Sequence, residues 1–181
     1  MKQLLDALTV VTSKFINLSK ERGELDTAGK NARLELEAAA GEGPLADARI
    51  ARRISAANQT LDAVSARRAY ISTQLRPIVG QTKEALRTAD GAWTSVIRAN
   101  GNRIAAAFYA ANVLFFAGNL RECQRNLNHE ILPAWQENNR ALWLMNACEL
   151  TEDNLIQYVR SFLNKVEEHY ERLDLTLGTE K

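Results

Sequence analysis

Histidine beside a carboxylate is the arrangement in this sequence that comes nearest to metal-binding or acid–base chemistry. It occurs twice, at His129-Glu130 and at Glu167-Glu168-His169. A di-iron helical bundle needs two Glu-x-x-His spacings and further inward-facing glutamates on other helices. Asn126 and Val166 stand where those glutamates would have to be. We therefore expect both clusters to be ordinary surface residues of helices, and we expect no metal site.

Other recognisable catalytic and cofactor motifs are missing from the sequence. It contains no Gly-x-Ser-x-Gly turn, no Walker A loop and no Gly-x-Gly-x-x-Gly loop. The two cysteines, Cys123 and Cys148, do not form a Cys-x-x-Cys pair, and we expect them to be buried free thiols in a reducing compartment. The sequence favours a protein that is not an enzyme and that has no cofactor and no small-molecule substrate.

Arginine supplies the second candidate chemistry, the recognition of anions. Six arginines lie between residues 49 and 76: Arg49, Arg52, Arg53, Arg67, Arg68 and Arg76. The planar guanidinium group matches a carboxylate or a phosphate with two parallel hydrogen bonds. Residues 44–89 carry eight basic and three acidic side chains, whereas residues 128–181 carry five basic and ten acidic ones. The arginines could therefore meet the acidic C-terminal third, within the chain or between neighbouring copies, or they could bind nucleic-acid phosphates.

Charge and aromatic content favour the first of these two interpretations. The net charge is +1 and the isoelectric point is about 7.8, below the value of about 9 that is common in nucleic-acid-binding domains. Tyr70 is the one aromatic residue that accompanies the arginines, so stacking on bases would be limited. We expect a protein partner or self-association, and nucleic acid is the alternative partner.

Three tryptophans are candidate anchors of a protein interface. Trp93, Trp135 and Trp143 belong to the residue type most enriched at binding hot spots. In a helical protein, tryptophan more often packs in the core. Core packing is therefore the main expectation for these three residues, and an interface role is the alternative.

A long antiparallel helical hairpin in residues 1–76 must position the arginines. Apolar or small residues follow a strict four-three spacing from Leu4 to Ala39, interrupted by Arg22, and again from Ile50 to Leu75, interrupted by Arg68. This spacing is typical of a coiled-coil seam. The first helix should end at Gly41-Glu42-Gly43-Pro44, with Pro44 opening the second helix.

Three further features of the hairpin follow from its sequence. We expect the second helix to end at Arg76, before Pro77, and a bend or break of the first helix is expected near Gly23 to Gly29. If the hairpin closes about residues 42 and 43, an ion pair forms between Arg22 and Asp62. Arg68 would then lie near residues 15–17, with no acid opposite it.

The remainder, residues 77–181, is expected to form a helical bundle that packs with the hairpin as a single domain. A helix over residues 79–99 should end at Asn100-Gly101. Residues 103–117 are apolar almost all round, which predicts a central helix covered by others. Pro133 should kink or restart a helix, and Thr151 should cap the N-terminus of the last one.

The sequence as a whole predicts an all-α protein that acts as a scaffold or adaptor. Residues 1–11 lack the apolar core of a signal peptide. The apolar stretch of residues 104–117 is shorter than the ~20 residues that a membrane-spanning helix needs. We therefore expect a cytoplasmic protein, and we regard a membrane as an unlikely partner.

Overall fold

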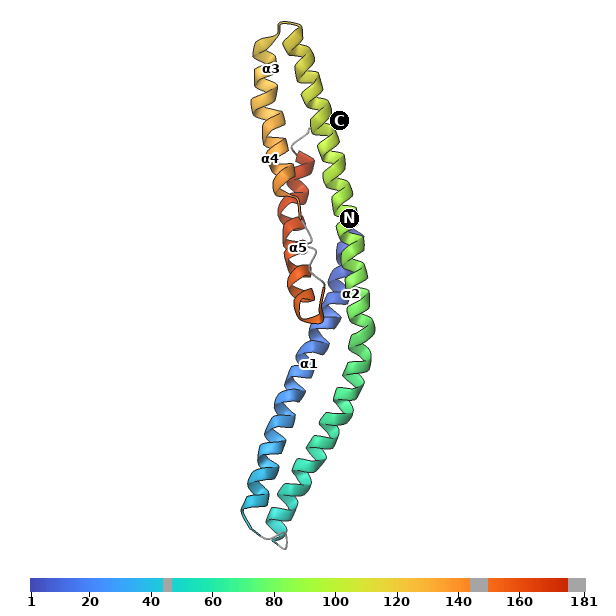
Figure 1. The fold of residues 1–181 in the computed structure, drawn as a ribbon, viewed down its shortest axis with the longest axis vertical. Coiled ribbons are helices and arrows are strands. Elements are labelled where there is room, and N and C mark those ends of the chain that lie inside the picture. The colour runs from blue at the N-terminus through green and yellow to red at the C-terminus, as the bar shows by residue number, and fades with distance from the viewer. Residues whose placement is uncertain (44–46, 144–149, 176–181) are drawn as a thin grey trace. The chain divides into compact units, whose positions relative to one another are not determined.

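The structure, a computed structural model, describes residues 1–43, 47–143 and 150–175. Five α-helices and one π-helical turn make up these residues (Figure 1): α1 (Lys2–Gly41), α2 (Ala48–Phe116), α3 (Leu120–Asn126), η1 (Leu127–Ile131), α4 (Leu132–Arg140) and α5 (Glu152–Leu175). The described residues contain no β-strand. The prediction of an all-α protein is confirmed.

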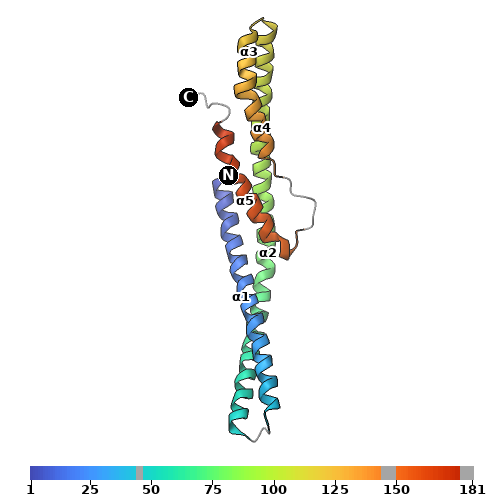
Figure 2. The same ribbon diagram turned by 90° about the vertical axis from the view of Figure 1, so that its left-hand side faces the viewer.

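Residues 9–82 form one compact unit, the antiparallel hairpin of α1 and α2 (Figures 1 and 2). Within it, every predicted seam position is buried or half-buried, and Phe15 and Ile71 are among the most completely buried side chains. Gly29 allows the two helices to approach closely, because a Cβ atom there would lie 3.3 Å from Val64 Cγ1. The helix α1 runs through Gly23 and Gly29 without the expected break.

Two predicted helix ends in α2 are wrong. Pro77 lies inside the helix at a solvent-exposed position, where water can hydrate the carbonyl group that lacks an amide partner. The buried seam continues on both sides of it, at Leu75 and Thr82. Asn100 is buried and its Nδ2 group donates a hydrogen bond to Asn138 Oδ1 at 3.0 Å. The predicted turn at Asn100-Gly101 is therefore a packing position within the helix.

The register of the hairpin also differs from the prediction. The second helix begins at Ala48, and Pro44, which was expected to open it, lies outside the described residues. Because the second helix begins later than expected, the turn that joins the two helices is centred C-terminal to residues 42 and 43. Arg68 consequently forms an ion pair with Asp26, so the expectation that it lacks an acid is wrong. The ion pair between Arg22 and Asp62 stays a prediction.

The second compact unit joins residues 1–8 to residues 83–181. Its core is built from large side chains of α2 and α5, and the following are among those fully buried: Leu86, Trp93, Leu155, Val159, Phe162 and Val166. The border expected at residue 76 lies inside α2. That the two parts act as a single domain stays a prediction.

Within the second unit, the chain reverses direction directly after α2. Gly118 adopts a positive φ of 83°, and its amide donates a hydrogen bond to the carbonyl of Phe115 at 3.0 Å. The amide of Asn119 donates to the carbonyl of Leu114 at 2.9 Å. These two bonds are the glycine-dependent C-cap of the Schellman motif. The returning helix, α3–η1–α4, then packs against the end of α2 (Figure 1).

The returning helix adapts to Pro133 through its π-helical turn. Pro133 has no amide hydrogen and is the second residue of α4, which begins directly after η1. In η1, the amide of Leu132 donates a hydrogen bond to the carbonyl of Leu127, five residues earlier. The expected disturbance at Pro133 is thus a widened turn in a continuing helix.

The N-terminus of α5 carries the predicted cap. The amide of Asn154 donates a hydrogen bond to Thr151 Oγ1 at 3.4 Å, and the amide of Thr151 donates one to Asn154 Oδ1 at 2.8 Å. This reciprocal pair resembles a capping box, with asparagine in place of glutamate. The prediction that Thr151 caps this helix is confirmed.

Candidate interaction surface

The segment of residues 103–117 is not the covered central helix that its composition predicts. Ile104 and Ala111 are buried against Cys123 and Ile131 of the returning helix, and burial of the Cys123 thiol was predicted. Other sides of the segment are open: Tyr109 is 71% exposed and Phe116 is 85% exposed. Among the described residues, the returning helix covers one side of this segment and leaves the rest in solvent.

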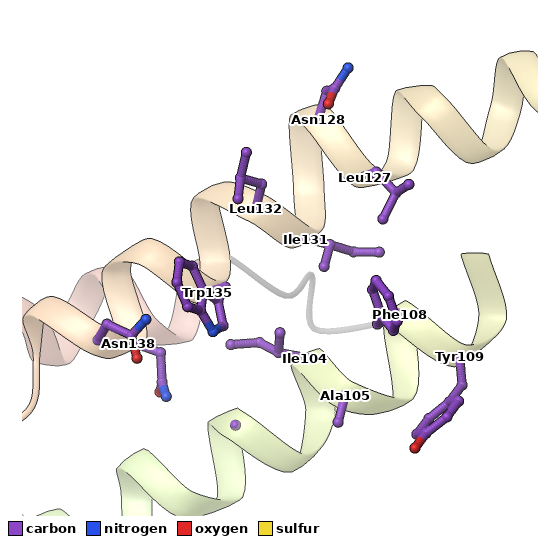
Figure 3. Close-up of a pocket in the computed structure, with 12 residues that line it drawn as sticks. Ile104, Ala105, Phe108, Tyr109, Leu127, Asn128, Ile131, Leu132, Trp135 and Asn138 are labelled. Carbon is purple, nitrogen blue, oxygen red and sulfur yellow. The ribbon is translucent and has the colours of Figure 1, made fainter. Parts of the chain in front are cut away.

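An open groove with a volume of about 730 Å³ lies between α2 and the returning helix. We call it the apolar groove. In Figure 3, Ile104 and Phe108 of α2 point toward Ile131 and Trp135 of the returning helix. The residues that line it are Gly101, Ile104, Ala105, Phe108, Tyr109, Leu127, Asn128, Ile131, Leu132, Trp135, Asn138 and Asn139. Its surface is therefore mostly apolar.

None of these lining residues carries a charge. The polar side chains among them are Tyr109 and three asparagines. Asn138 is held in place by the hydrogen bond that it accepts from Asn100. Because an amide both donates and accepts hydrogen bonds, the asparagines can orient a bound group without selecting for its charge.

One of the three candidate tryptophans lies in the apolar groove. Trp135 is 53% exposed, as an interface anchor should be. Trp93 is a core residue: it is 1% exposed, and its Nε1 group donates a hydrogen bond to the carbonyl of Ala141 at 3.0 Å. Trp143 is half-buried and packs edge-on against Phe162, with ring centroids 5.1 Å apart.

Three of the six candidate arginines form ion pairs with carboxylates of α1, and one of them also pairs with Glu42, which directly follows α1. Arg53 contacts Glu35 at 2.7 Å and Glu42 at 2.5 Å. Arg67 contacts Glu21 at 2.6 Å, and Arg68 pairs with Asp26. The hydrogen bonds from Arg53 and Arg67 lower the pKa values of the Glu35 and Glu21 carboxyl groups. The expected carboxylates of the C-terminal third are not the partners of these three.

The other three arginines, Arg49, Arg52 and Arg76, are exposed and form no ion pair among the described residues. Arg76 lies about 40 Å from Arg49 along the helix axis, given a rise of ~1.5 Å per residue. They do not form one cluster. Residues 49–76 therefore offer less unpaired positive charge to a polyanion than their composition suggests.

The two histidine–carboxylate clusters have different environments. His129 and Glu130 are exposed, as expected. The expectation is wrong for His169, which is 2% exposed and lies with its Nδ1 atom 2.6 Å from Glu137 Oε1. Position 169 shares the buried face of α5 with Val166 and packs toward α4. Within the described ranges, no group of three or more potential ligands is arranged to hold a metal ion.

Lys165 completes this buried cluster. Its Nζ atom lies 3.4 Å from His169 Nε2 and donates a hydrogen bond to the carbonyl of Arg140 at 3.1 Å. This arrangement could not be predicted from local sequence patterns, because Glu137 and His169 are far apart in the chain. Their contact joins α4 to α5, and neither residue lines the apolar groove.

In the described part of the chain, no helix has both the length and the apolar character needed to cross a lipid bilayer. Comparisons with models of protein families, with curated proteins and with solved structures found no match to this chain.

Proposed function

We propose that this chain is a non-enzymatic helical adaptor that acts by binding a protein at the apolar groove. The exposure of this groove is the observation that carries the proposal. Proteins in water rarely leave a contiguous apolar patch of more than a few hundred Å² uncovered, and such patches commonly mark binding sites. Trp135 and Phe108 are both about half exposed there, and aromatic residues of this kind act as anchors in interfaces.

The shape of the groove supports a helical segment as the bound group. The groove follows two packed helices, from Gly101 to Tyr109 on one side and from Leu127 to Asn139 on the other. An amphipathic helix can place its apolar face in such a groove and leave its polar face in water. One or two further helices would cover the apolar faces that α2 and the returning helix leave exposed.

A role without catalysis fits the placement of the titratable groups. The buried histidine of the second unit, His169, is held between Glu137 and Lys165. The lining of the groove contains no histidine, carboxylate, lysine or cysteine side chain. A site built in this way can bind a surface but lacks the side chains that most often act as a general acid or base.

The nucleic-acid alternative has weaker support. Arg53, Arg67 and Arg68, which it would use on phosphates, contact carboxylates of α1 instead. A phosphate would have to displace these intramolecular pairs. We therefore place the binding function at the apolar groove.

Site-specific photocrosslinking in the source cells tests this function. The photoreactive residue p-benzoylphenylalanine, which is itself aromatic, would replace Trp135 in one variant and Leu132 in another. Tyr70, which is exposed to a similar degree in the hairpin, provides the matched control position. We expect discrete adducts, identified by mass spectrometry, at positions 135 and 132 but not at position 70. Equal labelling at all three positions, or no adduct at any of them, would contradict the proposed function.

A further inference from the structure

We propose that the protein bound at the apolar groove is a second copy of this chain. The two copies would pack groove to groove about a two-fold axis, so that the α2 segments and returning helices of both form a four-helix arrangement. This inference rests on the proposed function, because it names the partner of the same site. Three observations support it: the area of the groove face, its lack of charge, and its asparagines.

The exposed area approaches the area that a dimer interface buries on each partner. Three aromatic side chains line the groove: Phe108, Tyr109 and Trp135. Phe115 follows Phe108 by seven residues, which at about 3.6 residues per turn places it on a similar side of α2 beyond the groove. Each of these four side chains is about half exposed or more. At ~200 Å² per aromatic side chain, they expose roughly 450 Å². Leu132 and the smaller lining residues extend this area toward the ~800 Å² that each partner buries in a standard interface.

The absence of charge favours a copy of the same chain over a partner of opposite charge. A two-fold interface brings the residues near its axis close to their own equivalents, so charged residues there would repel their copies. The lining of the apolar groove contains no charged residue. The nearby Arg125 and Glu122 on the returning helix contact each other at 3.8 Å. The lining residues of two grooves can therefore meet without like-charge repulsion.

The asparagines make the face complementary to itself. A side-chain amide donates and accepts hydrogen bonds, so it can pair with the same group in a second copy. Asn128 and Asn139 are exposed at the groove, and Asn138 accepts its bond from Asn100 through Oδ1. The Asn138 amide nitrogen remains available as a donor. Residues of this kind fix the register of two apolar helix pairs.

Light scattering on the full chain over a range of concentrations tests the inference. The test variant combines Leu132→Glu with Trp135→Glu, and Val10→Glu is the control, because Val10 is an equally exposed apolar residue outside the groove. Glutamate has a high helix propensity, so the helices should be retained. We expect about twice 20.2 kDa for the wild type and the control, and a monomer for the test variant. Circular dichroism should show unchanged helix content in all three.

The other outcomes separate this inference from the proposed function. A wild-type monomer at every concentration overturns the inference, and the proposed function survives only if photocrosslinking identifies a different protein at position 135. A dimer that persists in the double variant, or a wild-type mass well above a dimer, overturns the groove-to-groove arrangement. A monomer that binds phosphatidylcholine–phosphatidylserine vesicles through Trp135 overturns both proposals in favour of a membrane surface.

Discussion

Single buried polar residues connect the helices of the second unit. Glu137 on α4 and His169 on α5 form a contact of 2.6 Å that lies almost out of reach of water. Their burial could not be predicted from local sequence, because a histidine among glutamates is usually exposed. The deciding fact is that position 169 continues the apolar face of α5, which only the packing of α5 on α4 reveals. Trp93 and Trp135, by contrast, were singled out by residue type, and packing separates their roles.

Replacing Glu137 with alanine should destabilise the protein. The substitution leaves the buried His169 ring without its acceptor, and an unsatisfied buried polar group costs about 1–3 kcal/mol. Urea unfolding followed by circular dichroism measures this loss. Glu168→Ala is the matched control, because Glu168 also contacts His169, at 3.5 Å, but is exposed. Equal losses of stability in Glu137→Ala and Glu168→Ala would contradict the explanation that burial makes the contact of Glu137 with His169 important for stability.

Asp90 should make stability depend on pH. Burial raises the pKa of its carboxyl group above the ordinary value of 3.8, so the folded state binds a proton more tightly than the unfolded state. The ionised group therefore opposes folding at neutral pH. We expect Asp90→Asn to raise the melting temperature at pH 7. The gain should shrink as the pH falls through the raised pKa toward 3.8. A gain that is constant with pH would contradict this explanation.

Periodicity predicts the helices more reliably than it predicts their ends. The four-three spacing correctly identifies the faces of α1 and α2 that are buried in the hairpin. It does not reveal that α2 continues for 69 residues, because Pro77 and Asn100-Gly101 are residues that typically end a helix. A proline on the exposed face, and an asparagine that finds a partner in Asn138, are compatible with a helix that packs on both sides of them. The register of the hairpin likewise depends on where α2 begins.

Pro77→Ala tests the continuity of α2. Proline is about 3 kcal/mol less favourable than alanine inside a helix, so the substitution should increase the free energy of unfolding by an appreciable part of that amount. Gln74→Ala, at another exposed position of the same helix, should have little effect. If Pro77→Ala is neutral or destabilising in thermal unfolding, the helix ends near residue 76, as its sequence alone suggests.

Many apolar side chains of residues 103–117 and of the returning helix are not covered by any described part of the chain. An all-round apolar helix has the same sequence whether its own chain or another chain buries it, so the sequence predicted a central helix for residues 103–117. In the structure, much of this segment stays exposed, together with Trp135 and Leu132. The fold class could be predicted. For Trp135 the main expectation, core packing, is wrong, and its role as an interface anchor stays a prediction. The groove could not be predicted, because it depends on the path of the returning helix.

Hydroxyl-radical labelling of side chains, read by mass spectrometry at increasing protein concentration, tests most directly whether a second copy covers the apolar groove. Trp135 and Tyr109 should be labelled in dilute protein and become protected as the concentration rises. Tyr70 in the hairpin should stay equally reactive, and the buried Trp93 should stay unreactive throughout. If Trp135 remains as reactive as Tyr70 at every concentration, a second copy does not occupy the groove.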